Sequence, residues 1–155
     1  MGNPARYPEI EQLLGSAFPG LKPGQYSITS PADPAYNCGA WAAGTQSRFW
    51  RPTREPDYFW PHGVPMDESL PAFKAAFAIE GYLECSTEAF EDAIEKVAIF
   101  VDANGVPSHA ARQLPNARWT SKLGRSVDIE HDLRAVEGIE YGTVAAVLAR
   151  PVRRP

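Results

Sequence analysis

Residues 95–105 read EKVAIFVDANG, and this stretch decides the fold expected of the chain. Its central apolar run is rich in β-branched and aromatic residues and has the length of a buried strand. The Asn104-Gly105 pair that follows favours a tight hairpin turn, because both residue types tolerate positive φ angles. We therefore predict a strand over residues 95–102 that turns back into a second strand over residues 106–114.

Turn signals on either side of this hairpin divide the rest of the chain. Downstream of it, the pattern predicts a turn at Pro115-Asn116, a third strand over 117–123, a helical turn over 128–133 and a last strand over 141–148. Upstream of it, apolar residues at helical spacing predict helices over 8–18, 37–45 and 67–79, with an extended loop over 19–37. Helices followed by an antiparallel sheet indicate a single α+β domain spanning residues 1–155.

Composition and charge limit the classes of function. The net charge of −4 gives no electrostatic basis for a nucleic-acid partner. No apolar run approaches the roughly 18 residues of a membrane span, and no signal-peptide pattern opens the chain, so we expect a cytoplasmic protein without a membrane partner. The three histidines include no close-spaced ligand pair and no glycine-rich phosphate loop is present, so we expect neither a metal nor a cofactor.

Two cysteines are too few for a disulfide framework, although a bond between Cys38 and Cys85 stays open. Cys38 is the more informative of the two, because turn-forming residues 30–34 precede it and a short helical segment follows it. A thiol at the start of a helix is placed where backbone N–H groups favour the thiolate. A lone cysteine is otherwise most often a buried and inert side chain, so both interpretations stay open.

His109 lies within the second predicted strand and is the candidate partner of this cysteine. Cysteine catalysis needs a thiol, a base that takes its proton and a third group that holds the base in the right tautomer. Cys38 and His109 supply the first two if the strands fold back onto the helix that begins at Cys38. His62 is predicted to be structural or exposed, and His131 to be solvated or to act as a cap.

The identity of the third group depends on the register of the hairpin. A two-residue loop at Pro115-Asn116 would place His109 opposite Lys122, whereas a three-residue loop that includes Leu114 would place it opposite Ser121. A serine hydroxyl can accept a hydrogen bond from an imidazole N–H and an ammonium group cannot, so Ser121 is preferred. Gln113, which shares the strand face of His109, is the second candidate.

Two further features bear on substrate or partner binding. Arg112 and Lys122 flank the histidine and are interpreted either as ligands of an anionic substrate group or as charges that face solvent. The stretch over residues 49–61 lacks a helical or strand period, and we predict that it covers the core rather than lining a pocket. Alternatively, its aromatic side chains serve as interface anchors: Phe49, Trp50, Tyr58, Phe59 and Trp60.

Four blocks carry a resemblance to known proteins: Tyr36-Asn37-Cys38 with Ala40-Trp41-Ala42, Glu95 to Ile99, His109 to Gln113, and Trp119 to Gly124. Through these blocks the chain resembles an uncharacterised family of small bacterial proteins over residues 30–151. More distantly it resembles the papain-like cysteine hydrolases, especially the bacterial cell-wall endopeptidases. That resemblance implies N-terminal helices packed on a C-terminal antiparallel sheet, a nucleophilic Cys38, a basic His109 and a third polar residue on the following strand.

The chain departs from these enzymes in two ways. We expect neither their usual secretion signal nor a wall-binding module, and its third residue is not an obvious histidine, asparagine or glutamine. We expect a thiol-dependent hydrolase or acyltransferase that acts on an amide or thioester bond of a peptide or other amide-containing substrate. The alternative is a catalytically inactive papain-like module that binds a protein partner or a small ligand. The candidate catalytic residues are Cys38, His109, Ser121 and Gln113.

Overall fold

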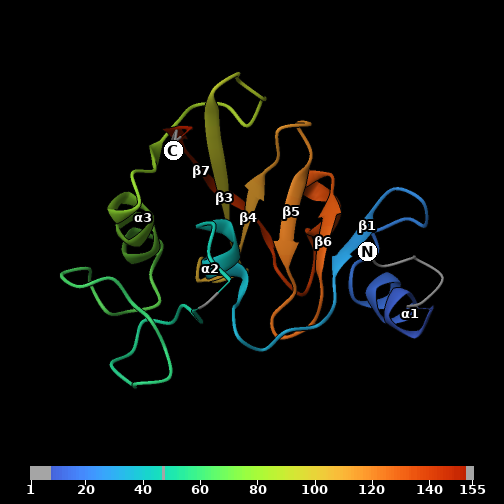
Figure 1. Ribbon diagram of the computed structural model, residues 1–155, viewed down its shortest axis with the longest axis horizontal. Helices are drawn as coiled ribbons and strands as arrows, with labels where there is room; N and C mark the ends of the chain where they lie inside the picture. Colours follow the sequence, from blue (N-terminus) through green and yellow to red (C-terminus); the bar gives the residue numbers. More distant parts are fainter. Residues whose placement is uncertain (1–7, 47, 153–155) are drawn as a thin grey trace.

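A seven-stranded antiparallel sheet forms the centre of the molecule (Figure 1). The structure is a computed structural model and describes residues 8–46 and 48–152. The strands are β1 (Ser27–Ser30), β2 (Leu83–Glu84), β3 (Ile94–Val101), β4 (Pro107–Gln113), β5 (Trp119–Lys122), β6 (Asp128–His131) and β7 (Thr143–Pro151). Their order across the sheet is β1-β6-β5-β4-β3-β7-β2, so β3 to β6 form a meander of consecutive neighbours.

The hairpin predicted at Asn104-Gly105 is confirmed in the middle of this sheet. β3 pairs with β4 along one edge and with β7 along the other. Asp102 closes the turn: its N–H donates to the Val106 carbonyl oxygen at 2.9 Å, and its carboxylate accepts the N–H groups of Asn104 and Val106. Gly105 has a φ of 77°, a left-handed conformation that glycine adopts at little cost.

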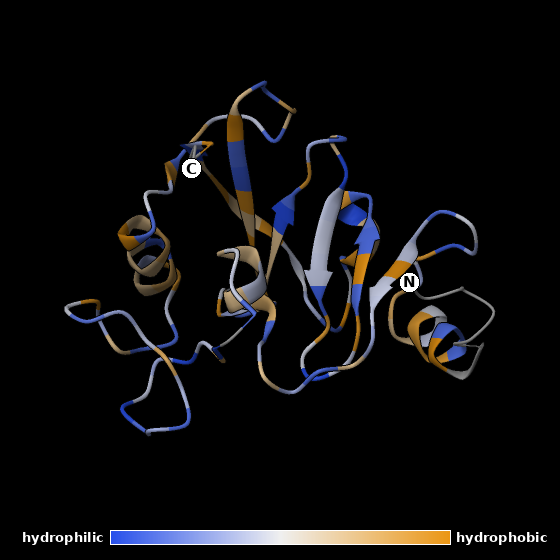
Figure 2. Cartoon of the chain, in the orientation of Figure 1, coloured by the Kyte–Doolittle hydropathy of each residue, from blue (hydrophilic) through white to orange (hydrophobic). Residues whose placement is uncertain are grey.

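The helices of the described residues are short. They are α1 (Pro8–Ala17), α2 (Cys38–Ala42), α3 (Leu70–Ile79) and a 3-10 helix over Leu133–Val136. Side-chain oxygens cap two of them: Asn37 accepts the Ala40 N–H at the start of α2, and Ser69 accepts the Ala72 N–H at the start of α3. The three predicted α-helices are confirmed, each over a shorter range than expected. Figure 2 shows α3 as mostly hydrophobic, in keeping with its burial against the sheet.

Side chains alternate along β3 and divide the core into two layers, one on each face of the sheet. Val97 and Ile99 pack in a first layer with α2, α3 and the aromatic stretch that follows α2. Ala98 and Phe100 pack in a second layer with α1 and the 3-10 helix. Figure 1 shows α2 in front of the sheet, with α3 beside one edge and α1 beside the other.

The expected papain-like α+β fold, with N-terminal helices packed on a C-terminal antiparallel sheet, is wrong. β1 precedes α2 and pairs with β6 at one edge of the sheet, and β2 follows α3 and pairs with β7 at the opposite edge. The α-helices in the described part of the chain are only five or ten residues long. The fold is a seven-stranded antiparallel sheet with short helices packed on it, and it is richer in strand than the papain-like fold that was expected.

Two local predictions fail because the strands concerned depend on distant partners. The loop predicted over 19–37 contains β1, which has a single apolar residue and joins the sheet partly through a hydrogen bond from the Thr29 hydroxyl to the Asp128 carboxylate. The helical turn predicted over 128–133 is instead β6, in which Ile129 is buried in the second layer. Short polar strands of this kind are stabilised by pairing across the sheet, so local sequence carries little signal for them.

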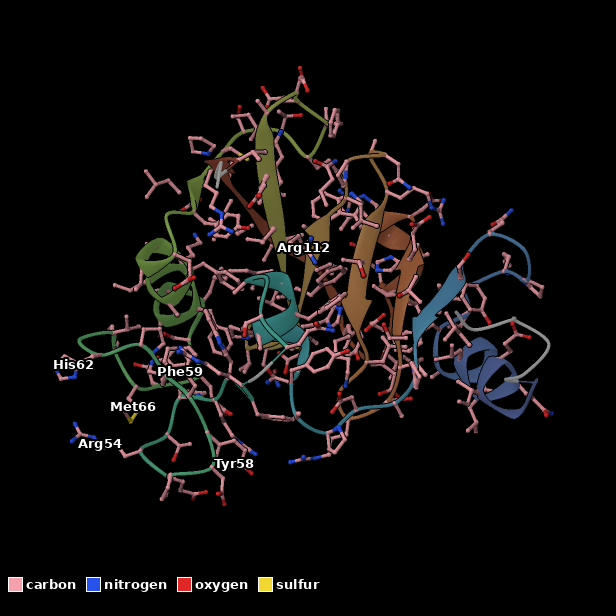
Figure 3. The ribbon with its side chains drawn as sticks, viewed as in Figure 1. Arg54, Tyr58, Phe59, His62, Met66 and Arg112 are labelled. Carbon is pink, nitrogen blue, oxygen red and sulfur yellow. The ribbon has the colours of Figure 1, made fainter. Side chains whose placement is uncertain are left out.

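The aromatic stretch over 49–61 covers the first layer of the core, as predicted, but residues 49–52 also line a pocket, which the prediction excluded. Trp50 and Trp60 are 6% and 8% exposed and pack against α3, so neither is free to act as an interface anchor. The indole N–H of Trp60 donates to the Pro65 carbonyl oxygen at 3.0 Å, which ties the end of this stretch to the residues that follow it. His62 is exposed at its outer end (Figure 3).

Three properties of the described residues bear on the class of protein. Cys38 and Cys85 are both free thiols, so the disulfide left open by the sequence does not form. None of the helices in residues 8–46 and 48–152 combines the length and apolar character that crossing a membrane requires. Within the same residues, no group of three or more histidine, cysteine, aspartate or glutamate side chains is arranged to hold a metal ion.

Candidate active site

Cys38 is the first residue of α2, and Asn37 fixes the backbone immediately before it. The Asn37 side chain donates to the Trp50 carbonyl oxygen at 2.7 Å and accepts the Trp50 N–H at 2.9 Å, in addition to capping the helix. These bonds tie the start of α2 to the aromatic stretch. The Trp41 indole N–H donates to Thr120 Oγ1 at 2.9 Å and holds α2 on β5. The backbone that carries Cys38 is therefore fixed on both sides.

A cavity of about 210 Å³ opens at the start of α2, and both Cys38 and His109 line it. The other walls come from the aromatic stretch, from α3 with the residues before it, and from the beginning of β4. They include Phe49, Trp50, Arg51, Phe73, Glu68, Pro107 and Ala110. The fold thus brings the two residues singled out in the sequence to one cavity.

Cys38 and His109 approach this cavity from opposite faces of β4. Ala110 packs in the first layer with α2, and its backbone N–H approaches the Cys38 sulfur. His109 is the preceding residue, so its side chain lies on the other face, where its ring centroid is 5.2 Å from that of Phe100. Among the described residues, no hydrogen bond joins the sulfur to the imidazole. The two groups share a cavity without bonding to each other.

His109 belongs to a hydrogen-bond network that crosses three adjacent strands. Its Nε2 lies 2.8 Å from Ser121 Oγ on β5, and the same oxygen lies 2.6 Å from Nε2 of His131 on β6. His131 Nδ1 lies 2.7 Å from the Asp132 carbonyl oxygen. His109 is 4% exposed, and the other two side chains are fully buried. We call His109, Ser121 and His131 the His–Ser–His network.

The carbonyl at one end of the His–Ser–His network fixes the position of each proton. A carbonyl oxygen only accepts, so His131 Nδ1 carries hydrogen and Nε2 of the neutral ring is an acceptor. The Ser121 hydroxyl therefore donates to His131, and its oxygen accepts the Nε2–H of His109. Nδ1 of His109 keeps its lone pair and is buried without a hydrogen-bond partner in the described part of the chain. The network thus leaves a lone pair without a hydrogen-bond donor at this nitrogen.

Burial keeps the groups of this site neutral. It lowers the pKa of His109 well below the ordinary value of 6.5, and the nearby His131 acts in the same direction. Burial also lowers the pKa of His131 to about 4, against the opposing effect of its carbonyl acceptor. It raises the pKa of the Cys38 thiol and outweighs the backbone N–H groups around the sulfur. The thiolate expected from the helix-start position is therefore wrong for the resting protein, which holds a thiol and a neutral imidazole.

Lys122 is a structural cation and does not face solvent. It is fully buried, and its Nζ donates to the carbonyl oxygens of Asp33 and Gly124 at 2.6 and 2.7 Å. The ammonium group also lies 4.6 Å from the centre of the Tyr36 ring. Its charge favours the thiolate form of Cys38, although burial has the larger effect on that pKa. Because its ammonium is committed to these carbonyls, Lys122 is not an anchor for a substrate anion.

The register of β4 and β5 differs from both predicted loop lengths. Gln113 pairs with Trp119, so the loop spans residues 114–118. Ser121 consequently lies on the same face of the sheet as His109 but diagonally across from it, rather than directly opposite. A serine hydroxyl reaches a histidine ring across such a diagonal, because the long imidazole side chain covers most of the gap.

Gln113 takes no part in the His–Ser–His network, whereas His131 completes it. The Gln113 side-chain N–H donates to the Glu88 carbonyl oxygen at 3.1 Å, which turns its amide away from His109. The solvated or capping role predicted for His131 is wrong, because this residue is fully buried on a strand. The signal that could have identified it is the alternation in Asp128–His131. A strand there places His131 on the same buried face of the sheet as Ile129.

Residues 27–149 match the family described as Domain of unknown function (DUF7689). The chain belongs to the DUF7689 family. The DUF7689 match begins at β1 and ends within β7, so it contains Cys38 and the whole His–Ser–His network and leaves out α1. No curated protein and no solved structure matches the chain.

Proposed function

We propose that this protein is a thiol-dependent hydrolase or acyltransferase that acts on an amide or thioester bond. The observation that carries the proposal is the His–Ser–His network, which leaves Nδ1 of His109 without a hydrogen-bond partner in a residue that lines the same cavity as Cys38. An imidazole that is hydrogen-bonded at one nitrogen and has an unpartnered lone pair at the other is arranged as a general base. In this proposal Cys38 is the nucleophile and His109 the base, while Ser121 and His131 are positioning residues.

The proposed reaction begins with attack of the Cys38 sulfur on the substrate carbonyl carbon, while the thiol proton passes to His109 Nδ1. The C=O electron pair moves onto the oxygen, where the backbone N–H of Cys38 stabilises the charge. Collapse re-forms the carbonyl and breaks the bond to the leaving nitrogen or sulfur, which takes the proton from His109. The product is an acyl thioester on Cys38. Water attacks this thioester in hydrolysis, and an amine or thiol attacks it in acyl transfer. Either attack releases the Cys38 thiol.

The neutral resting state supports general-base catalysis rather than a preformed ion pair. Burial raises the pKa of Cys38 and lowers that of His109, so a thiolate–imidazolium pair is disfavoured in the free protein. Proton transfer is therefore expected to accompany attack on the carbonyl. The absence of a Cys38–His109 hydrogen bond in the free protein fits such a mechanism, because catalytic hydrogen bonds often tighten only when substrate is bound.

The walls of the cavity favour a small acyl group without charge. Phe49, Trp50 and Phe73 contribute aromatic side chains to its walls. Its charged wall residues, Arg51 and Glu68, are exposed and so lie toward its mouth. An apolar interior with charges at the entrance suits an uncharged acyl group next to the scissile carbonyl.

The activated ester 4-nitrophenyl acetate tests this proposal, because it is a small acyl donor with a coloured leaving group. We expect a burst of 4-nitrophenol and one acetyl group on Cys38, located by peptide mass spectrometry. Cys85→Ser is the matched control: it keeps Cys38, removes the other thiol and should react like the wild type. Cys38→Ala should show no burst. His109→Gln should slow acylation by about 100-fold or more, the usual contribution of a general base.

Two results of this experiment contradict the proposal. One is acetylation confined to Cys85, and the other is acylation of Cys38 that is as fast in His109→Gln as in the wild type. Iodoacetamide alkylation of Cys85→Ser, followed from about pH 6 to about pH 10, gives an independent measure of the thiol. We expect the Cys38 reaction to rise at higher pH than that of an ordinary cysteine, whose pKa is about 8.5.

A second candidate function, a catalytically inactive module that binds a protein partner, is favoured by the surface of the aromatic stretch. The Arg48 guanidinium lies 4.2 Å from the centre of the Phe59 ring, and that of Arg51 lies 5.3 Å from the centre of the Tyr58 ring. Figure 3 shows Tyr58 and Phe59 in this outer part of the molecule. Half-buried aromatic rings beside arginines are typical of interface anchors. For such a module, acyl donors leave Cys38 unmodified and partner binding is unchanged in Cys38→Ala.

A further inference from the structure

Two arginines and two aromatic rings form a continuous surface next to the cavity that Cys38 lines. The Arg125 guanidinium lies 4.5 Å from the centre of the Phe49 ring, and that of Arg51 lies 5.3 Å from the centre of the Tyr58 ring. The two rings meet edge to face, with centroids 5.6 Å apart. The contacts therefore run without a break from Arg125 through Phe49 and Tyr58 to Arg51. We call these four residues the Arg–aromatic surface.

Backbone pairing holds the parts of this surface together. The Phe59 N–H donates to the Phe49 carbonyl oxygen, and the Arg51 N–H donates to the Phe59 carbonyl oxygen, both at 2.9 Å. Side chains alternate along such an extended segment, so Phe49 and Arg51 share one side while Trp50 between them enters the core. Phe49 and Arg51 also line the Cys38 cavity, so the Arg–aromatic surface is continuous with that cavity.

Neither arginine of the Arg–aromatic surface forms an ion pair within the part of the chain that the structure describes. Both are exposed, and the Arg125 side chain donates to the Pro34 carbonyl oxygen at 3.4 Å. Glu55 and Asp57 lie between the two paired segments but are not ion-paired with either arginine. Because the whole chain carries a net charge of −4, two such cations on one surface oppose its overall charge and favour an anionic partner there.

Arg112, which the sequence suggested as a ligand of an anionic group, is set apart from this surface. Its side chain is half-buried, and its Nε donates to the Trp41 carbonyl oxygen at 3.3 Å. The nearby Glu95 carboxylate also acts on its charge. Figure 3 shows Arg112 at the centre of the molecule and Tyr58 in its outer part. The role of anion ligand beside the Cys38 cavity is therefore better suited to Arg51 and Arg125.

The aromatic rings hold the two exposed cations ready for a ligand. A guanidinium that lies on an aromatic ring keeps its N–H groups free at the edge, where a carboxylate binds through two parallel hydrogen bonds. A side chain already held by stacking also loses less conformational freedom on binding than an unrestrained arginine. Two such cations on one surface suit a segment with several carboxylates better than a single anion.

We propose that the Arg–aromatic surface binds an acidic segment of a peptide substrate whose scissile carbonyl lies in the Cys38 cavity. This proposal rests on the function proposed above, because it assigns the segment to the acyl donor that Cys38 attacks. Arg51 and Arg125 pair with carboxylates of the segment, and the Phe49 and Tyr58 rings contact the chain between them. The residue at the scissile carbonyl itself is small and uncharged.

A pair of peptide thioesters tests this substrate class on the unmodified protein. One is an acetylated peptide in which glutamate alternates with glycine and which ends in a glycine ethyl thioester. The other has glutamine in place of every glutamate. Attack by the Cys38 sulfur forms the acyl-enzyme and releases ethanethiol in both cases. We expect the glutamate peptide to acylate Cys38 about tenfold faster, because two exposed ion pairs contribute a few-fold each. Added salt should remove most of this difference.

Arginine variants test whether the preference arises at the Arg–aromatic surface. The measured quantity is the ratio of the two acylation rates within each variant, so a folding defect that affects both substrates cancels. Arg51→Gln and Arg125→Gln should each lower this ratio by about threefold. Arg54→Gln is the matched control. It removes an exposed guanidinium of the same stretch that lines a different cavity, and it should keep the wild-type ratio.

The outcomes separate this proposal from the proposed function. If 4-nitrophenyl acetate acylates Cys38 but the two thioesters react equally fast, only the acidic substrate is overturned. The same holds if Arg54→Gln lowers the ratio as much as the other two variants, because net charge alone would then explain the preference. Oligothymidylate that inhibits the glutamate thioester more strongly than the free glutamate peptide does would assign the surface to phosphates instead. If neither the acetate nor the thioesters acylate Cys38, the proposed function itself fails.

Discussion

The phenol ring of Tyr141 lies flat on the imidazole of His109, with ring centroids 3.9 Å apart and ring planes 3° from parallel. The hydroxyl of Ser108 donates to the Tyr141 carbonyl oxygen, so the residue before His109 also holds the backbone of Tyr141. The stack closes one side of the imidazole, while Ser121 fixes its Nε2. Together these contacts allow the His109 ring very little freedom to rotate.

We predict that Tyr141→Leu lowers the rate of Cys38 acylation by about tenfold and the free energy of unfolding by about 1 kcal/mol, the usual contribution of an aromatic pair. Tyr141→Phe is the matched control, because it keeps the ring stack and removes only the hydroxyl. It should leave both quantities close to those of the wild type. Burst kinetics and urea unfolding measure the two effects, and equal rates in the Leu and Phe variants would show that the stack does not position His109.

Ser121→Ala removes the central hydroxyl of the His–Ser–His network. It leaves two buried imidazole nitrogens without partners, on His109 and His131, so the free energy of unfolding should fall by about 2–4 kcal/mol. Ser86→Ala, at an exposed serine, should change it by less than about 0.5 kcal/mol. Urea denaturation of both variants checks the difference. A Ser121→Ala protein as stable as the control would mean that the network is not formed in solution.

The pH dependence of stability should report the buried His131. Its pKa is about 4 in the folded protein and about 6.5 in the unfolded chain, so between these values the unfolded chain binds more protons. The free energy of unfolding should therefore be greatest above about pH 6.5 and fall as the pH drops toward 4. The contribution of His131 to this fall should be about 3 kcal/mol. The lowered pKa of His109 acts in the same direction.

Two histidine variants separate this effect from general acid unfolding. His131→Gln should flatten the loss of stability between pH 6.5 and 4, because the glutamine does not titrate. His62→Gln, which replaces an exposed histidine, should leave the profile of the wild type unchanged. Urea unfolding at several pH values gives both curves. Identical profiles for the two variants would show that His131 is not buried as a neutral ring.

Gly142 is predicted to be the least replaceable glycine next to this site. It has a φ of 71°, and a Cβ there would overlap the Val101 carbonyl oxygen. Gly142→Ala should therefore lower the free energy of unfolding by more than about 3 kcal/mol, through backbone strain and overlap together. Gly105→Ala has a similar φ of 77° but open space around the added carbon, so it should cost only about 1–2 kcal/mol. Thermal unfolding of the two variants separates overlap from backbone strain.

The sequence contained enough local information for the centre of the sheet and for the helices. The hairpin at Asn104-Gly105 followed from an apolar run next to a turn dipeptide, and both signals lie within a few residues of each other. The start of α2 was predicted at about residue 37, after the turn-forming residues 30–34, and the structure shows the Asn37 side chain capping the helix there. These elements are specified locally, so a single sequence predicts them.

The predictions that failed concern elements that are specified by contacts between distant segments. β1 and β6 pair as an antiparallel ladder supported by the contact of Thr29 with Asp128, and β4 and β5 pair in a register that neither predicted loop length gives. The hydrogen bond between His109 and Ser121 is present, but the register that forms it is a third one. His131 was missed for the same reason, because its role depends on a strand that local sequence does not reveal.

The His–Ser–His network also has a consequence for how the protein assembles. Its two hydrogen bonds join residues only 12 and 10 positions apart, within consecutive strands of one meander. The bond from Trp41 to Thr120, which docks α2 and its cysteine, joins residues 79 positions apart. Closing short loops costs less entropy than closing long ones, so the histidine half of the site can form while the segment with Cys38 is still unfolded. The helix that carries the thiol then docks onto a sheet in which the histidine is already oriented.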